Sequence, residues 1–113
     1  MEKKRIDYVE WDVITRYQKL SEHFIEKYKD EFDWDLICTF QKPMSEEFIM
    51  KHSDLVNWDI IYREQILSDE FILDLYTQLD STKISKFQKL SENTIRELNE
   101  WLNWLYQNMV IKT

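Results

Sequence analysis

The sequence predicts an all-α protein, a short solenoid of about four capped helical hairpins that ends in a longer C-terminal capping helix. Three observations favour this fold. The 113 residues contain no glycine and a single proline, Pro43, so glycine-based tight turns and glycine-ended helices are excluded. A tryptophan-led motif recurs along the chain. Each copy of that motif contains two helix starts.

The composition is that of a folded domain. At 43% hydrophobic and 15% aromatic residues, the chain is too apolar to be disordered. No apolar run approaches the roughly 18 residues of a membrane span, and the start of the chain has no apolar stretch typical of a signal peptide. The one cysteine, Cys38, excludes an internal disulfide and is typical of a reducing compartment. We therefore expect one domain, residues 1–113, in the cytoplasm and without a membrane partner.

An internal repeat organises the sequence. Trp-Asp-x-Ile occurs three times with a glutamine seven residues after each tryptophan, and a fourth, degenerate copy has Ser81 in the tryptophan position. The spacing is 23 residues, lengthened to 24 once by Pro43. The predicted repeats are residues 10–33, 34–57, 58–80 and 81–98, approximately, with the glutamines Gln18, Gln41, Gln65 and Gln88.

Capping patterns predict two short helices in each repeat. A serine N-cap and a flanking hydrophobic staple open the second helix at Ser21, Ser45, Ser68 and Ser91. The first helices have Asp33, Asn57 and Asp80 as caps, and a poorer one in Glu10. A capped helix therefore begins every 11 or 12 residues, which is the pattern of an array of α-hairpins.

The last helix is longer. Residues 91–110, approximately, contain no second cap and are predicted to form one helix. Its buried stripe is predicted from the helical spacing of Ile95, Leu98, Leu102, Leu105 and Met109. Because a repeat array needs an atypical end, we expect this helix to cap the array, and the first ten residues to cover the other end through Ile6, Tyr8 and Val9.

The repeated unit W-D-x-I-x-x-Y-Q-K-L-S-E-x-F-I resembles a short tandem repeat found in proteins of phages, large DNA viruses and mobile elements. Residues 11–25 match it almost completely, and 34–49 match it with Pro43 inserted. The third copy departs at Glu64, Ile66 and Asp69, and the fourth lacks its tryptophan and phenylalanine. The resemblance implies a helical repeat module of viral association, in the cytosol of a host cell. It transfers no catalytic residue, because the motif is a packing signature.

The recurring polar residues have structural explanations. Asp12, Asp35 and Asp59 lie near helix starts, where negative charge complements the helix dipole, so they need no metal. The four glutamines are expected to bond the backbone of the turn between paired helices. A second acidic set lies at the first position of the second helices: Glu22, Glu46, Asp69 and Glu92. In a stack of repeats these residues would line one edge, and we call them the acidic ridge. This ridge is a candidate contact surface.

No catalytic, cofactor or metal site is predicted. Cys38 occupies a slot that holds Thr15, Tyr62 and Ser85 in the other copies, so we expect it to be partly exposed. The only histidines, His23 and His52, lie at non-equivalent positions of different repeats. A Cys–His nucleophile or a zinc site would need them to converge by accident. The three repeat tryptophans are expected in the core.

The last helix carries the most specific candidate for partner binding. Placed at 100° per residue, Trp104 lies roughly 140° from the centre of the buried stripe and is expected in solvent between Glu97, Glu100 and Asn108. Trp101 falls at the edge of the stripe. Because tryptophan is enriched at interface hot spots, this face is expected to bind a partner or a second copy of the chain.

These observations favour a non-catalytic, acidic protein-binding module. The net charge of -7 argues against direct nucleic-acid binding. The resemblance, the size and the charge are similar to phage inhibitors of host defence systems, including anti-CRISPR proteins, so the expected partner is a host protein or nucleoprotein complex whose basic surface is occluded. The alternative is a structural homo-oligomer or assembly subunit that associates through the C-terminal tryptophan helix.

Overall fold

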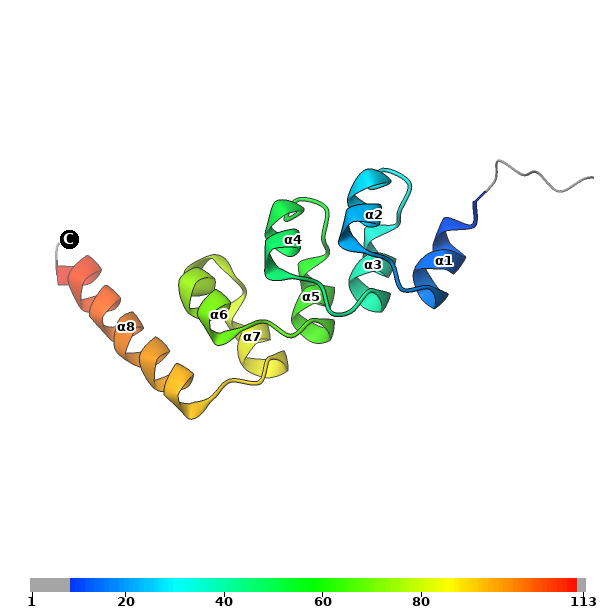
Figure 1. Cartoon of the computed structure of the whole chain (residues 1–113). Helices are drawn as coiled ribbons and strands as arrows, with labels where there is room; N and C mark the ends of the chain where they lie inside the picture. Colours follow the sequence, from blue (N-terminus) through cyan, green and yellow to red (C-terminus); the bar gives the residue numbers. More distant parts are fainter. Residues whose placement is uncertain (1–8, 112–113) are drawn as a thin grey trace, which may run out of the picture. The chain divides into compact units, whose positions relative to one another are not determined.

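The computed structural model describes the backbone of residues 9–111 and the side chains of residues 9–108. Within these bounds it has eight α-helices, one 3-10 turn and no strand, which confirms the prediction of an all-α repeat fold (Figure 1). The chain divides into two compact units, Met1–Gln65 and Ile66–Thr113. None of the helices in the described part is long and apolar enough to cross a bilayer.

The first unit contains five short helices, and they follow the sequence repeat. These are α1 (Trp11–Tyr17), α2 (Glu22–Lys27), α3 (Trp34–Phe40), α4 (Glu46–Lys51) and α5 (Trp58–Glu64). The first helices of successive repeats stack, because α3 packs against α1 and α5 packs against α3 (Figure 1). The second helices α2 and α4 form a parallel row beside them (Figure 1).

The second unit contains α6 (Asp69–Leu75), a 3-10 turn (Tyr76–Gln78), α7 (Ser81–Phe87) and α8 (Glu92–Ile111). In this unit α6 packs against α8. The bounds of α8 agree within a residue with the predicted long helix. Where the second helices of earlier repeats end after two turns, α8 continues for 20 residues.

The predicted caps determine where the helices begin. The Ser21 and Ser45 hydroxyl oxygens accept from the N–H groups of Phe24 and Phe48, and the second unit repeats this at Ser68 and Ser91. Asp33, Asn57 and Asp80 cap the first helices in the same way. Glu10, the predicted poor cap, makes no side-chain capping bond. These caps satisfy helix-end N–H groups, so the chain reverses repeatedly without glycine.

Isoleucines form the centre of the core of each unit, one from nearly every helix. Ile25, Ile37, Ile49, Ile61, Ile72 and Ile84 have almost no exposed surface. Of the three repeat tryptophans predicted in the core, Trp34 is buried and Trp11 and Trp58 are half-buried. Trp34 stacks on Phe48 at 6.0 Å between ring centroids and donates its Nε1–H to the Lys29 carbonyl. Trp11 likewise packs against Phe24 of α2, so these two tryptophans each join the two helices of one repeat, whereas Trp58 contacts Tyr62 of its own helix.

The predicted stripe of α8 is only partly correct. Leu98 is buried and Leu102 and Leu105 are half-buried, but Ile95 is 51% exposed, and Thr94 is buried in its place. Isoleucines equivalent to Ile95 are buried in the earlier repeats, whereas no helix among the described residues follows to cover Ile95. The predicted contacts of Met109, Ile6 and Tyr8 lie outside the described side chains, and Val9 is exposed.

Candidate functional site

Aromatic side chains and carboxylates are exposed together on one face of α8. Trp104 is 58% exposed, as its helical angle predicts, and Trp101 is 41% exposed. Glu97 and Glu100 are also exposed on this helix. The helix continues through this region, because the Asn108 amide donates to the Trp104 carbonyl from one turn later. The sequence prediction therefore identified this face correctly as solvent-accessible.

A shallow hollow lies between α6 and α8. It has a volume of about 210 Å³ and is lined by Leu73, Glu97, Leu98 and Trp101. Its wall is apolar apart from the Glu97 carboxylate. An aromatic ring next to a carboxylate is suited to the aliphatic stem and cationic head of lysine or arginine. The structure thus brings Trp101 and Glu97 together at one hollow, whereas the sequence analysis placed Glu97 beside Trp104.

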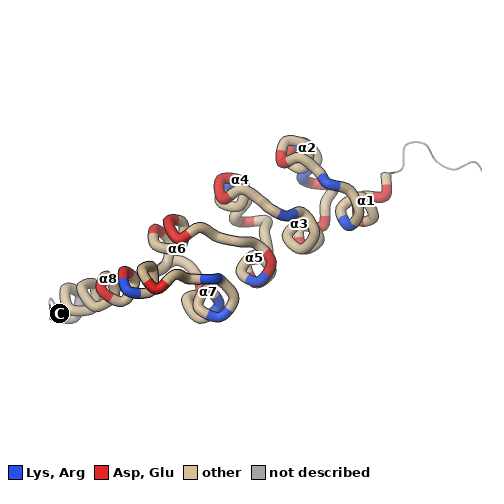
Figure 2. Tube along the Cα trace, turned by 60° about the horizontal axis from the view of Figure 1, so that its bottom comes forward, with Lys and Arg blue, Asp and Glu red and all other residues tan. Residues whose placement is uncertain are grey.

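The acidic ridge of Glu22, Glu46, Asp69 and Glu92 has a structural role at two of its positions. The Glu22 carboxylate accepts from both the N–H and the hydroxyl of Ser45, each at 2.7 Å. In the second unit, Asp69 accepts from the hydroxyls of Thr94, at 2.7 Å, and Ser91. These carboxylates therefore hold the cap of the next second helix in place. Figure 2 shows the acidic residues at the starts of α4 and α6 in red.

A second hollow, which the sequence prediction missed, lies between α2 and α4. Its volume is about 350 Å³, and it is lined by Glu22, His23, Glu26, Ser45, Glu47, Phe48 and Lys51. At its floor the Glu26 carboxylate lies 2.7 Å from Nε2 of the buried His52 and 3.3 Å from the Lys51 ammonium. The hydrogen bond with His52, followed by that with Lys51, holds the pKa of Glu26 below its ordinary value despite partial desolvation.

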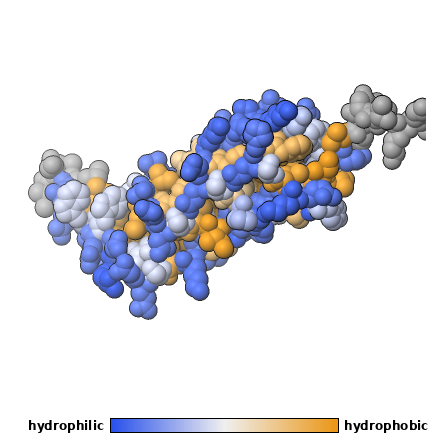
Figure 3. Space-filling view, viewed as in Figure 1, coloured by the Kyte–Doolittle hydropathy of each residue, from blue (hydrophilic) through white to orange (hydrophobic). Residues whose placement is uncertain are grey.

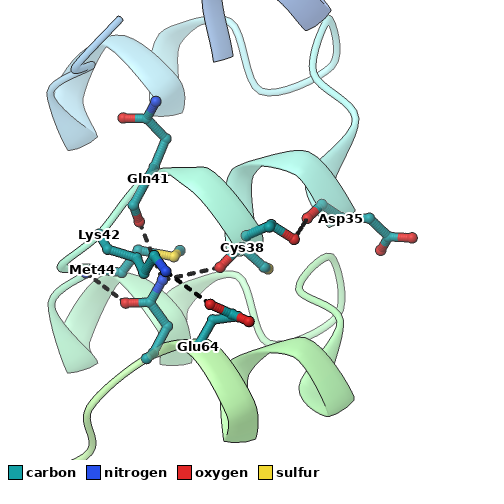
Figure 4. Close-up of polar contacts among 8 residues, drawn as sticks. Asp35, Cys38, Gln41, Lys42, Met44 and Glu64 are labelled. Atoms are coloured by element: carbon teal, nitrogen blue, oxygen red, sulfur yellow. Dashed lines mark hydrogen bonds and ion pairs between the residues drawn. The ribbon is translucent and has the colours of Figure 1, made fainter. Parts of the chain in front are cut away.

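The glutamines bond turns as predicted, but the turn belongs to the preceding repeat. The Gln65 amide donates to the carbonyls of Cys38 and Gln41 and accepts from the Met44 N–H (Figure 4). Gln41 makes the same three bonds one repeat earlier, to Thr15, Gln18 and Leu20. In the second unit the Gln88 oxygen accepts from Leu67 N–H. Each internal glutamine therefore joins two repeats through main-chain groups.

The expected partial exposure of Cys38 is wrong. Its side chain is completely buried, and desolvation raises the pKa of the thiol to about 11. The equivalent Thr15 and Tyr62 are buried as well. The slot tolerates a hydroxyl in the core because, at Thr15, the Oγ1–H donates to the Trp11 carbonyl one turn earlier. Polarity at this position was therefore a misleading sign of exposure.

The histidines serve separate purposes. His52 is buried against the rings of Trp34 and Phe48, whereas His23 is exposed at the hollow between α2 and α4. Within the described residues, no group of three or more histidine, cysteine or acidic side chains is placed to hold a metal ion.

The exposure of several other apolar residues was not predicted from the sequence. Tyr106 is exposed on α8, and Ile66 and Tyr17 are exposed at helix ends. Figure 3 shows apolar side chains reaching the surface between hydrophilic ones. Tyr106 lies 11 residues after Ile95, about three helical turns, so both occupy the same side of α8. Because the sequence pattern placed Ile95 in the buried stripe, it gave no indication that Tyr106, on the same side of α8, would be exposed.

No protein-family model matches the chain, and no curated protein and no solved structure matches it either.

Proposed function

We propose that the protein is a non-catalytic, acidic protein-binding module and that the exposed face of α8 around Trp101 and Trp104 contacts its partner. The observation that carries this proposal is the exposure of Trp101 and Trp104 on one helix, beside Glu97 and Glu100. Burying large aromatic side chains stabilises protein interfaces more than burying most other residues, and tryptophan is enriched at interface hot spots. Leaving them in water has no stabilising effect on the fold.

The partner that fits this face presents lysine or arginine side chains. The hollow between α6 and α8 offers the Trp101 ring and the Glu97 carboxylate to a single cationic side chain. The net charge of -7 favours the same class of partner at longer range. A basic surface of a host defence protein or nucleoprotein complex meets these requirements, in keeping with the resemblance to viral repeat proteins. Binding would act by occluding that surface.

Affinity capture with matched variants tests this proposal. The tagged protein, Trp104→Ala and the double variant Glu97→Lys/Glu100→Lys are used to capture proteins from a host lysate. Two controls change exposed residues outside α8: Ile66→Ala removes apolar surface, and Asp54→Lys reverses a charge. We expect one complex to be captured by the wild type and both controls, and to be lost by the α8 variants. Truncating a hot-spot tryptophan should weaken binding of the purified complex about 30-fold or more.

The salt dependence of that binding tests whether charge complementarity drives it. Affinity should fall between about 50 mM and about 500 mM salt, because exposed charges are screened over shorter distances at high salt. An affinity that does not change with salt contradicts occlusion by charge complementarity. Equal capture by all variants contradicts the assignment of α8. If the wild type captures only further copies of itself and Trp104→Ala does not, the result favours the alternative of a homo-oligomer joined through the tryptophan helix.

A further inference from the structure

Three kinds of bond join the first repeat to the second, and one of them, the glutamine bond, recurs between the second repeat and the helix that follows it in the first unit. A glutamine amide bonds the preceding turn, as Gln41 bonds Thr15, Gln18 and Leu20. An acidic residue bonds the serine cap of the next repeat, as Glu22 bonds Ser45. A cation lies over an aromatic ring of the next repeat, as the Arg16 guanidinium lies 5.5 Å from the centre of the Phe40 ring.

One half of this contact is exposed at α1. The Gln18 side chain is exposed and has no hydrogen-bonding partner among the described residues. Tyr17, which corresponds to Phe40, is 78% exposed. Ile14 is only half-buried, whereas the corresponding Ile37 and Ile61 are completely buried. The groups that join α3 to the repeat before it are therefore all present in the first repeat, at the surface.

The other half of the contact is exposed in the fourth repeat. Ile95 is half exposed, whereas its counterparts Ile25 and Ile49 are buried. Glu92, the counterpart of Glu22, is exposed and has no partner among the described residues. The Leu90 N–H corresponds to the Leu20 N–H that Gln41 binds, and it makes no hydrogen bond in the described part of the chain. Lys86 stands in the position of Arg16.

We propose that the fourth repeat of one molecule binds the first repeat of a second copy of the same chain, head to tail. The Gln18 amide of the second copy bonds the turn that contains Leu90. The Glu92 carboxylate accepts from the N–H and hydroxyl of Ser21, the counterpart of Ser45. The Tyr17 ring lies against Lys86, and Ile14 and Ile95 are buried. Each pairing reproduces one that the chain already makes between its own repeats.

This surface and partner differ from those of the proposed function. The contact uses the two repeat ends rather than Trp101 and Trp104. It is also heterologous, because different surfaces of the two copies meet, so association continues into chains or closes into a ring. A symmetric contact through Trp101 and Trp104 of α8 would instead stop at a dimer. The two modes of self-association are therefore distinguishable by experiment.

The test measures molar mass by sedimentation or light scattering from about 1 µM to about 500 µM protein. One variant blocks the first repeat, Tyr17→Ala/Gln18→Ala, and another blocks the fourth, Glu92→Lys/Ile95→Lys. The altered side chains are exposed, so each variant should keep the wild-type helix content and unfolding temperature at low concentration. Trp104→Ala is the control for contacts through the tryptophans of α8.

We expect the mass of the wild type and of Trp104→Ala to rise with concentration. Each end-blocked variant alone should associate at least about 10-fold more weakly, because it leaves polar groups of the other surface unpaired. An equimolar mixture of the two blocked variants should form heterodimers and nothing larger, since one intact end of each kind remains. A monomeric wild type at every concentration overturns the proposal. So does a mixture in which no heterodimer forms, or self-association that Trp104→Ala alone abolishes.

Discussion

At the scale of single residues, the glutamine at each junction between repeats takes the place of the glycine turns found in other chains. Each hairpin turn leaves main-chain groups without partners inside the repeat. The Gln41 amide satisfies two carbonyl oxygens and one N–H of the turn before it, and its side chain is buried in doing so. Because an unpaired buried polar group is costly, the fold depends on this amide at every internal junction.

Replacing Gln41 with alanine should therefore destabilise the first unit. Leaving buried main-chain groups unpaired costs about 2–4 kcal/mol in the free energy of unfolding. The matched control is Gln18→Ala, whose amide is exposed and should change the free energy of unfolding little at low concentration. Urea unfolding followed by circular dichroism measures both variants. An equal effect of the two substitutions contradicts the structural role.

Cys38 should resist thiol reagents while the protein is folded. Its side chain is completely buried, and the pKa of the thiol, raised to about 11, keeps it protonated at neutral pH. We expect labelling at pH 7 to be orders of magnitude slower than in denaturant, with a rate set by unfolding. The rate of release of a chromogenic thiol reagent measures this. Fast labelling of the native protein, at the rate seen in denaturant, would refute the buried position.

At the scale of helices, charge and packing are divided between the two rows of the first unit. The first helices α1, α3 and α5 stack on one another through apolar residues and the glutamine bonds. The second helices α2 and α4 are joined largely by polar contacts, from Glu22 to Ser45 and from Glu26 to His52. An ion pair between Lys42 and Glu64, at 2.8 Å, joins the ends of α3 and α5 (Figure 4).

The contact of Glu26 with His52 makes stability depend on pH. The pKa of Glu26 is lowered in the folded state from its ordinary value of 4.5, so folding favours the ionised form. Its stabilising effect is therefore fully present above pH 4.5 and is lost as the pH falls through the lower folded-state pKa. Glu26→Gln should be less stable than the wild type at pH 6, and the difference should shrink toward pH 3.

The control for this experiment is Glu31→Gln, which changes an exposed carboxylate in the loop before α3. Urea unfolding at several pH values compares the three proteins. We expect the control to follow the wild type throughout. A difference between Glu26→Gln and the wild type that stays constant from pH 6 to pH 3 would show that the carboxylate charge does not contribute.

At the scale of the whole molecule, the repeats depend on their neighbours. A repeat in the interior of the first unit is covered on both sides, whereas residues 9–111 supply a neighbour on only one side of the first repeat. Ile37 is completely buried but the equivalent Ile14 is half-buried, and Gln41 is buried but Gln18 is exposed. In an array held by nearest-neighbour contacts, such an end repeat opens more easily than the interior.

Amide hydrogen exchange should therefore be faster in α1 than in α3 at low protein concentration, where the molecules are separate. Both helices have seven residues and similar C-terminal caps, but Asp33 caps the start of α3 whereas Glu10 makes no capping bond at α1, so the weaker cap adds to the effect of the missing neighbour. Exchange followed by mass spectrometry or NMR measures the two helices in one sample. Equal protection of α1 and α3 would indicate that the unit opens only as a whole. Slower exchange of α1 at high concentration would support association of repeat ends.

The positions of the helices follow from local sequence patterns. The serine, aspartate and asparagine caps predicted the starts of α2 to α8, because a cap acts through bonds to its own helix. The 23-residue period predicted the repeat, and the helical angle of Trp104 predicted its exposure, since both follow from local geometry.

The contacts between repeats could not be predicted from local patterns and follow from the packing of the helices. Whether Ile95 is buried depends on a following helix and not on its own, and the same holds for the glutamine amides, which bond the preceding turn. Cys38 is buried because neighbouring repeats cover it, although its slot accepts polar residues. Burial is set by residues far apart in the sequence, whereas capping and periodicity are set by residues within one or two helical turns.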